Sequence, residues 1–212
     1  MSRACASRVI SSVDRETELA VVERLRQGDA DAFDELHAAF NTRLFTFLLR
    51  LSRRRDVAED LLEETWLRLV SHARKLRGDT RLGAWLFTVA RNLYVSYARS
   101  RLIEDSASAS LMALWPFSPA SASPFEAAVG SELERRIDRA LAALPMSSRE
   151  VLLLVGVAGL DHSDAADVCG ITPEALRQRL HRAREALSKL LERDLTAAAP
   201  ALGEMTSCNS GG

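Results

Sequence analysis

The residues with the clearest chemistry lie near the C-terminal end, on the segment from Thr172 to Leu191. Its apolar residues recur at helical spacing and predict a buried seam, so the opposite face would present Arg, Gln and His side chains to solvent. Arginine can donate two hydrogen bonds to guanine O6 and N7, and glutamine can pair with adenine N6 and N7. This face is therefore suited to recognising DNA bases and phosphates. Its members are Thr172, Glu174, Arg177, Gln178, His181, Arg182 and Arg184.

The residues before this segment predict a motif. A short helix is expected to start at about Ser163, and a tight turn follows at Gly170. Thr172 then offers a hydroxyl cap and Pro173 occupies the first helical position. A solvated helix face could carry the same arginines, but the turn and its spacing favour DNA. We therefore predict a helix-turn-helix over about residues 146 to 193.

A second group of basic and aromatic residues becomes visible when charge is mapped along the chain. The net charge is only −1, but residues 66 to 101 carry +7 and residues 177 to 193 carry +4, whereas residues 14 to 35 carry −5. Local fields steer a phosphate backbone, and Asn and Tyr can bond or stack on unpaired bases. The middle segment therefore predicts a second nucleic-acid surface. Its members are Arg74, Lys75, Arg77, Arg81, Arg91, Asn92, Tyr94 and Arg99.

An acidic helix face is expected just upstream of that surface. Helical spacing directs Ala58, Leu61, Leu62, Thr65 and Leu69 inward. The residues left outside are Glu59, Asp60, Glu63 and Glu64. Such a face is either an ordinary solvated surface or a surface that steers a basic partner.

The elements that position these residues are helices. Leu, Ala, Arg and Glu are abundant and favour helix, so we predict an all-α fold of two small helical domains joined by a flexible linker. The expected segments are a loose tail over 1–13, a domain over 14–104, a Ser/Ala/Pro-rich linker over 105–130, a helix-turn-helix domain over 131–195 and a disordered tail over 196–212. An apolar island, Leu114 to Phe117, lies in the linker. Its role stays open.

Several motifs resemble the sigma factors of bacterial RNA polymerase. Those similar to region four are Leu144-Pro145, Arg149 to Leu154 and Leu180 to Leu187, and those similar to region two are Asp56 to Leu69 and Ala84 to Leu93. The resemblance covers roughly residues 18 to 195. With only these two regions and a short linker, the chain resembles the extracytoplasmic-function group.

The resemblance implies a role for each surface. The helix-turn-helix face would read the minus-thirty-five promoter element, and the segment from Arg74 to Arg99 would capture the minus-ten element as the strands open, with one base flipped out. The acidic face would bind a coiled coil of the largest subunit of core RNA polymerase. An anti-sigma protein is an implied further partner. We expect a cytoplasmic protein that is monomeric when free, without membrane insertion, cofactor or metal.

Five positions depart from the family pattern. Glu63 stands where Gln is frequent, Leu82 where an aromatic residue is, Ser96 where Asp is, Ala165 where Ile is and Ala175 where Thr is. The region-two departures concern fine promoter contacts. The others suggest an atypical promoter and a looser helix-turn-helix core.

Two other classes of function can be weighed against this interpretation. A sigma-like mimic that sequesters an anti-sigma protein should lose its arginine faces, yet Arg177, Arg182 and Arg184 are present. An enzyme should place nucleophile, base or metal ligands at useful spacing, but the histidines and cysteines are scattered. Cys169, beside the predicted turn, fits a small buried residue better than a reactive thiol. We therefore predict a protein that is not an enzyme.

Overall fold

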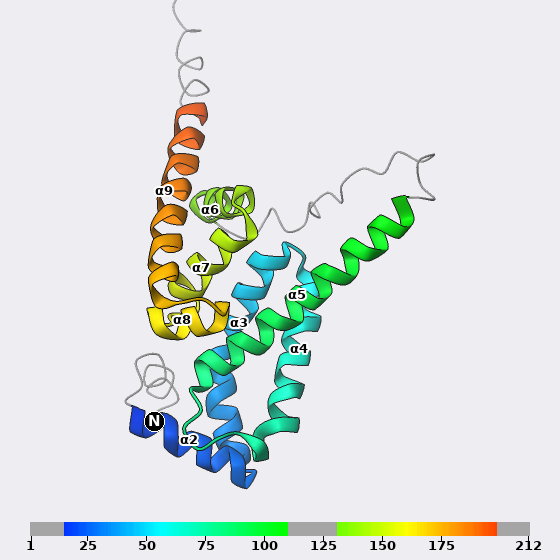
Figure 1. Ribbon diagram of the computed structural model, residues 1–212, viewed down its shortest axis with the longest axis vertical. Coiled ribbons are helices and arrows are strands. Elements are labelled where there is room, and N and C mark those ends of the chain that lie inside the picture. Colours follow the sequence, from blue (N-terminus) through cyan, green and yellow to red (C-terminus); the bar gives the residue numbers. More distant parts are fainter. Residues whose placement is uncertain (1–14, 110–130, 199–212) are drawn as a thin grey trace, which may run out of the picture.

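The computed structural model describes residues 15–109 and 131–198, and both stretches are mainly helical (Figure 1). The first stretch contains α2 (Arg15–Gln27), α3 (Ala30–Ser52), α4 (Arg55–His72), the 3-10 turn η2 (Ala73–Lys75) and α5 (Leu82–Ala109). The second contains α6 (Glu132–Ala143), α7 (Met146–Gly156), α8 (His162–Cys169) and α9 (Pro173–Ala198). The predicted all-α fold is confirmed. The apolar island Leu114 to Phe117, the tail over 1–13 and residues 199–212 of the C-terminal tail lie outside the described residues, whereas residues 196–198, predicted to be disordered, belong to α9.

Local sequence explains where several of these helices begin. The Asp29 carboxylate accepts hydrogen bonds from the backbone N–H groups of Asp31 and Ala32 and so caps α3. Ser131 and Glu134 form a reciprocal capping box at the start of α6. Such caps satisfy backbone donors that have no partner inside the helix.

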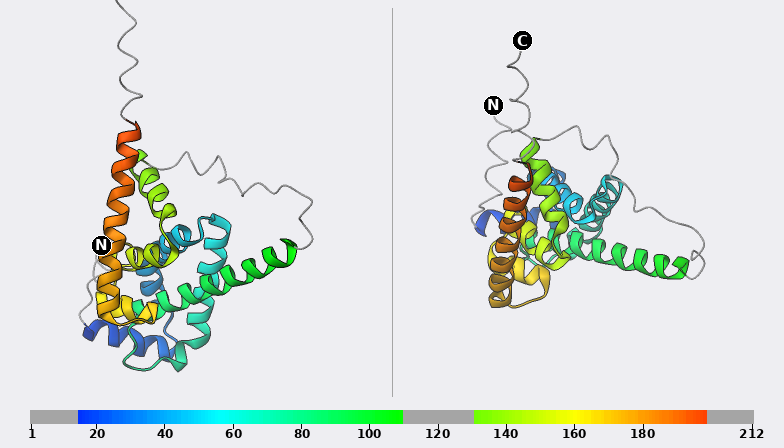
Figure 2. Two further views of the ribbon diagram at one scale, coloured as in Figure 1. Left: turned by 45° about the horizontal axis from the view of Figure 1, so that its top comes forward. Right: turned by 90° about the horizontal axis from the view of Figure 1, so that it is seen from above.

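Helix α3 is the centre of the first half, residues 15–109. It packs against α2, α4 and α5, and its fully buried Phe47 meets Phe87 of α5 edge to face, with ring centroids 5.3 Å apart. Aromatic pairs of this geometry add to the free energy gained from burial. The C-terminal part of α5 projects away from the other helices (Figures 1 and 2).

In the second half, residues 131–198, the long helix α9 packs along α6, α7 and α8. Arg149 of α7 is buried, and its guanidinium donates to the carbonyl oxygens of Leu141, Ala142 and Leu144 at the end of α6. The last carbonyls of a helix lack intrahelical partners, so this one side chain completes α6 and fixes its angle to α7.

The two halves lie against each other along a seam, which we define as the contacts of α3 and α5 with α6, α7 and α8. One cluster of buried apolar residues continues from Leu44 of α3 to Leu154 of α7 and Leu176 of α9. Helix α5 runs to Ala109 and α9 to Ala198, past residues 104 and 195 where the sequence predicts the domains to end. The seam brings the two basic segments into one body.

Candidate nucleic-acid interface

Helices α8 and α9 form the expected helix-turn-helix. Gly170 ends α8 with φ at 66°, a left-handed conformation that glycine adopts without strain. The Thr172 hydroxyl accepts a hydrogen bond from the Ala175 N–H at 3.2 Å, as predicted for the cap of α9. Helix α8 begins at His162, as predicted to within one residue, but Ser163 is not its cap: the Asp161 carboxylate accepts a hydrogen bond from the Asp164 N–H and caps the helix.

The recognition face, defined as the exposed side of α9 between Glu174 and Arg184 together with the cap residue Thr172, is turned to solvent. Leu176, Leu180 and Ala183 are buried beneath it. Five of its members line an open, shallow hollow: Glu174, Arg177, Gln178, His181 and Arg182. Arg184 is exposed further along the helix.

Acidic neighbours modulate this face without covering it. Arg177 donates to the Glu174 carboxylate and lowers the pKa of that carboxyl. His181 lies 3.6 Å from Glu185, measured from Nδ1 to Oε2. These pairs are exposed, so each can break at little cost when a phosphate or base edge replaces the carboxylate.

The second predicted surface is divided in the structure. Exposed residues of this surface are Arg74, Lys75, Arg77, Arg81, Asn92 and Arg99, while Arg91 is partly buried. Arg77 forms an ion pair with Asp79 at 3.1 Å but remains 84% exposed. Tyr94 is half-buried, and burial raises the pKa of its phenol. The exposed members form a basic rim around η2 and along α5.

Two arginines of this surface, the exposed Arg81 and the partly buried Arg91, form ion pairs with acids of the second half. Arg91 of α5 forms an ion pair with Glu150 of α7, which is only 2% exposed. Arg81 forms ion pairs with Asp164 of α8 and, at 3.4 Å, with Asp161. Within this arrangement their guanidinium groups are held by the second half, and a phosphate would have to displace those carboxylates.

Sequence reasoning missed the three acids that hold these arginines. Burial is the first cause of the raised pKa of Asp164; the charge of Asp161 adds to it and that of Arg81 opposes it. A signal for Glu150 was present, because it directly precedes the apolar run that starts at Val151. A charged residue at a buried position needs a partner, although the sequence could not say that the partner is Arg91.

The acidic face of α4 is present as expected. Ala58, Leu61, Thr65 and Leu69 are buried and Leu62 is half-buried, while Glu59, Asp60 and Glu63 are exposed and Glu64 is partly exposed. Glu59 pairs with Arg55, and Glu64 pairs with Arg68, both at 2.8 Å.

The same face of α4 carries apolar residues that sequence reasoning missed. Leu67 is 56% exposed and Val70 is 62% exposed. Leu67 lies four residues after Glu63 and three residues after Glu64, which places it on the same side of the helix. That spacing was the available signal. Large apolar side chains beside carboxylates give this face the composition of a docking surface.

The five positions that depart from the family pattern differ in their exposure to solvent. Leu82 and Ala165 are fully buried, Ala175 is partly buried, and Glu63 and Ser96 are exposed. Cys169 is buried as predicted, and burial raises the pKa of its thiol to about 12. A thiol in that state carries almost no thiolate at neutral pH.

In the parts of the chain that the structure describes, no three His, Cys, Asp or Glu side chains gather in a way that could hold a metal ion. No helix in residues 15–109 or 131–198 is long and apolar enough to cross a membrane.

Comparisons with known proteins match both halves separately. Residues 36–102 match the family model "Sigma-70 region 2", and residues 134–187 match "Sigma-70, region 4". The ECF RNA polymerase sigma factor EcfG of Rhodopseudomonas palustris is 35% identical over 159 residues, which are 74% of this chain and 83% of that protein. RNA polymerase sigma factor CarQ of Myxococcus xanthus is 35% identical over 171 residues, 80% of this chain and 95% of that protein.

A solved structure agrees with this relationship. The sigma factor RpoE of Bartonella quintana, solved in complex with the anti-sigma factor NepR, is 30% identical and superposes with a TM-score of 0.63. The match covers 76% of this chain and 96% of the RpoE chain. The paired region-two and region-four matches, the all-α fold and the helix-turn-helix agree. The chain belongs to the ECF family of RNA polymerase sigma factors.

Proposed function

We propose that this protein directs core RNA polymerase to promoters by reading two DNA elements, one with each half. The recognition face of α9 would read the minus-thirty-five element, using Arg177, Gln178 and Arg182 on base edges and Thr172, His181 and Arg184 on phosphates. The single observation that carries this proposal is that a capped helix-turn-helix presents an exposed Arg/Gln face in a chain of this family.

The first half would hold the minus-ten element. The basic rim, Arg74, Lys75, Arg77 and Arg99, would follow the phosphates, while Asn92 and Tyr94 would contact unpaired bases. Arg81 and Arg91 would join them after the seam opens, because Asp164 and Glu150 then release their guanidinium groups. Residues 14–104 and 131–195 would thus act as separate domains on DNA, joined by the segment 105–130.

Core polymerase would dock on α4. Asp60 and Glu63 supply negative charge, and the exposed Leu67 and Val70 supply apolar area beside them. We assign the contact to this face because charge steers the encounter while burial of apolar side chains holds the complex.

We further propose a cytoplasmic protein that performs no covalent chemistry and is monomeric when free. An anti-sigma protein would be a second partner, as NepR is for the relative from Bartonella quintana. Such a partner would act by stabilising a conformation in which the two DNA-binding faces cannot reach a promoter together.

Run-off transcription tests the proposal. The full-length protein is mixed with core polymerase and genomic fragments, and the transcript starts are mapped. We expect starts that share a pair of upstream motifs, and no such starts with core polymerase alone. A mimic that only sequesters an anti-sigma protein would yield no starts, and starts without a shared motif pair would contradict promoter selection.

A further inference from the structure

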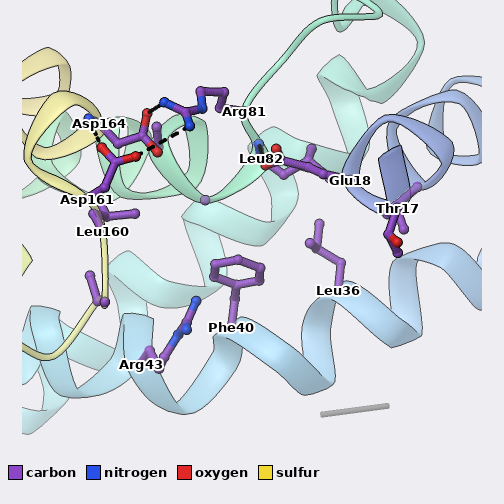
Figure 3. A pocket seen from close by; sticks show the side chains of 15 residues that line it. Thr17, Glu18, Leu36, Phe40, Arg43, Arg81, Leu82, Leu160, Asp161 and Asp164 are labelled. Carbon is purple, nitrogen blue, oxygen red and sulfur yellow. Dashed lines mark hydrogen bonds and ion pairs between the residues drawn. The ribbon is translucent and has the colours of Figure 1, made fainter. Parts of the chain in front are cut away.

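A half-open cavity of about 210 Å³ lies in the seam and is lined by residues of both halves of the chain (Figure 3). Helices α2 and α3 supply Glu18, Phe40 and Arg43, the segment before α8 supplies Leu160 and Asp161, and α8 itself supplies Asp164. We call this cavity the seam pocket. Because residues of both halves line it, it is complete only while the seam is closed.

Most charges around the seam pocket already have partners. Glu18 forms an ion pair with Arg15 at 2.7 Å and accepts the backbone N–H of Leu82 at 2.7 Å. Arg81 is paired with Asp161 and Asp164, on the side of the pocket opposite α3 (Figure 3). These groups therefore have little spare capacity for a ligand.

Arg43 is the exception among the charged residues of this pocket. Its guanidinium carbon lies 4.4 Å from the centre of the Phe40 ring, and no carboxylate of the described residues pairs with it. Its Nε is buried without a hydrogen-bond partner in the part of the chain that the structure describes. Burial also lowers the pKa of this guanidinium, yet arginine stays charged in proteins. A partly desolvated cation without a counter-ion is unfavourable.

The surroundings of Arg43 define what would satisfy it. The planar guanidinium can donate two parallel hydrogen bonds to a carboxylate. Leu36, Phe40 and Leu160 offer apolar walls beside it. A dianion such as phosphate fits less well, because the carboxylates of Glu18 and Asp161 line the same cavity. The volume is below that of pockets for drug-sized ligands, so it admits only a small molecule.

We propose that the seam pocket binds a small carboxylate, whose carboxyl group pairs with Arg43 while its apolar part packs on Phe40, Leu36 and Leu160. A ligand that contacts both halves stabilises the closed seam, because it binds the closed form and not the open one. The effect on DNA rests on the proposed function: the ligand lowers promoter binding because it keeps Arg81 and Arg91 paired with carboxylates of the second half.

Binding is tested on the full-length protein, without polymerase or DNA. Acetate, butyrate and benzoate are titrated by calorimetry at constant ionic strength, with chloride as the reference anion, and thermal unfolding is followed in parallel. We expect saturable binding for at least one carboxylate, a midpoint of unfolding that rises with its concentration, and slower amide exchange in α8. The absence of saturable binding for all three, or an equal effect of chloride, overturns the proposal.

Arg43→Gln supplies the decisive variant. It removes the cation but keeps a side chain of similar length, and we expect affinity to fall at least tenfold, roughly the value of a charge-assisted hydrogen bond. Without ligand its midpoint of unfolding should equal or exceed that of the wild type, because the lost cation had no counter-ion. A variant that binds the carboxylate as tightly as wild type overturns the assignment to Arg43.

Arg55→Gln is the matched control. Arg55 also lies over an aromatic ring, that of Phe45 at 5.7 Å, but it pairs with Glu59 and is far more exposed. It should bind the carboxylate like wild type.

Transcription is then measured with and without the ligand. If the wild-type protein binds the carboxylate but supports no transcription at all, the proposed function fails and the pocket proposal stands. If the wild-type protein supports transcription but does not bind the carboxylate, the pocket proposal fails and the proposed function stands.

Discussion

The two basic surfaces of this protein differ in what their arginines contact. On α9, Arg177 of the recognition face pairs with the exposed Glu174 of its own helix, and Arg182 donates to the Gln178 carbonyl oxygen of the same helix. On the first half, Arg91 meets the buried Glu150 of the other half, and Arg81 meets the buried Asp164 as well as the exposed Asp161. Similar residue types thus give a recognition face that is accessible to DNA and a first-half surface in which two arginines are paired with acids of the other half.

The difference follows from where the counter-charges sit. An exposed ion pair contributes little free energy and exchanges freely with a phosphate. A carboxylate such as Glu150, at 2% exposure, has lost its water and depends on its partner. In the closed seam, Arg81 and Arg91 of the proposed minus-ten surface are therefore paired with acids of the second half, whereas the recognition face remains exposed to solvent. Four changes test this contrast.

The largest effect should come from the free surface. In Arg177→Ala/Arg182→Ala we expect affinity for a minus-thirty-five duplex to fall by about two orders of magnitude, since each arginine contact to a base or phosphate contributes roughly a factor of ten. The free energy of unfolding should change by less than about 0.5 kcal/mol, because both side chains are exposed. Fluorescence anisotropy on a labelled duplex and urea unfolding measure the two quantities.

The control for that pair is Arg139→Ala, which removes an exposed positive charge of α6 away from the recognition face. It should weaken DNA binding far less. An equal loss in the control would mean that general charge, rather than the recognition face, holds the duplex.

The second change should act in the opposite direction. Glu150→Gln keeps the side-chain volume but weakens the pair with Arg91, so we expect a loss of about 1–2 kcal/mol in the free energy of unfolding. Affinity for single-stranded minus-ten DNA should rise about three- to tenfold, because the seam opens more readily and Arg91 becomes available. Anisotropy with a labelled oligonucleotide measures this gain.

Glu23→Gln is matched to that variant, since Glu23 also pairs with an arginine, Arg26 at 2.9 Å, but is 54% exposed on α2. It should change neither quantity measurably. A gain of affinity in this control, or none in Glu150→Gln, would remove the link between the seam and the minus-ten surface.

The third change is Asp164→Asn, whose effect on the free energy of unfolding should depend on pH. The pKa of Asp164 is raised, mainly by burial, so its contribution to stability is fully present below its ordinary pKa of about 4 and is lost as pH rises through the raised value. At pH 7 the neutral Asp164→Asn should therefore be as stable as wild type or slightly more stable. This advantage should shrink as pH is lowered toward 5.

Urea unfolding of both proteins at several pH values between 5 and 8 tests this sign. Asp167→Asn, an exposed position on the same helix, should show no such trend. An advantage of Asp164→Asn that grows on acidification would contradict the assignment of the pKa shift to burial.

The sequence was sufficient for features that depend on neighbours in the chain. The cap at Thr172, the turn at Gly170 and the buried side of α4 all follow from spacing within one or two helices. The acid–arginine pairs of the seam do not, because Arg91 and Glu150 are 59 positions apart and their meeting depends on how two helical units dock. For the same reason the exposure of the recognition face was predictable, while the occupation of Arg81 and Arg91 was not.

The smallest effect should come from Glu174→Gln on the recognition face. Glu174 pairs with Arg177 at the surface, and the hydrogen bond from Arg177 lowers the pKa of the Glu174 carboxyl. Removing this charge frees Arg177 and lessens repulsion of phosphates, so we expect binding of non-specific duplex to strengthen about two- to threefold at low salt and less at high salt.

Glu132→Gln, an exposed acid of α6 in the same half, is the control and should leave binding nearly unchanged. The comparison of the two surfaces then rests on magnitude. Removing Glu174 from an exposed ion pair gains little, because that pair breaks easily in any case. Removing Glu150 gains more, because it raises the fraction of molecules in which the seam is open and Arg91 is accessible. Equal gains at both positions would mean that seam closure does not limit access to DNA.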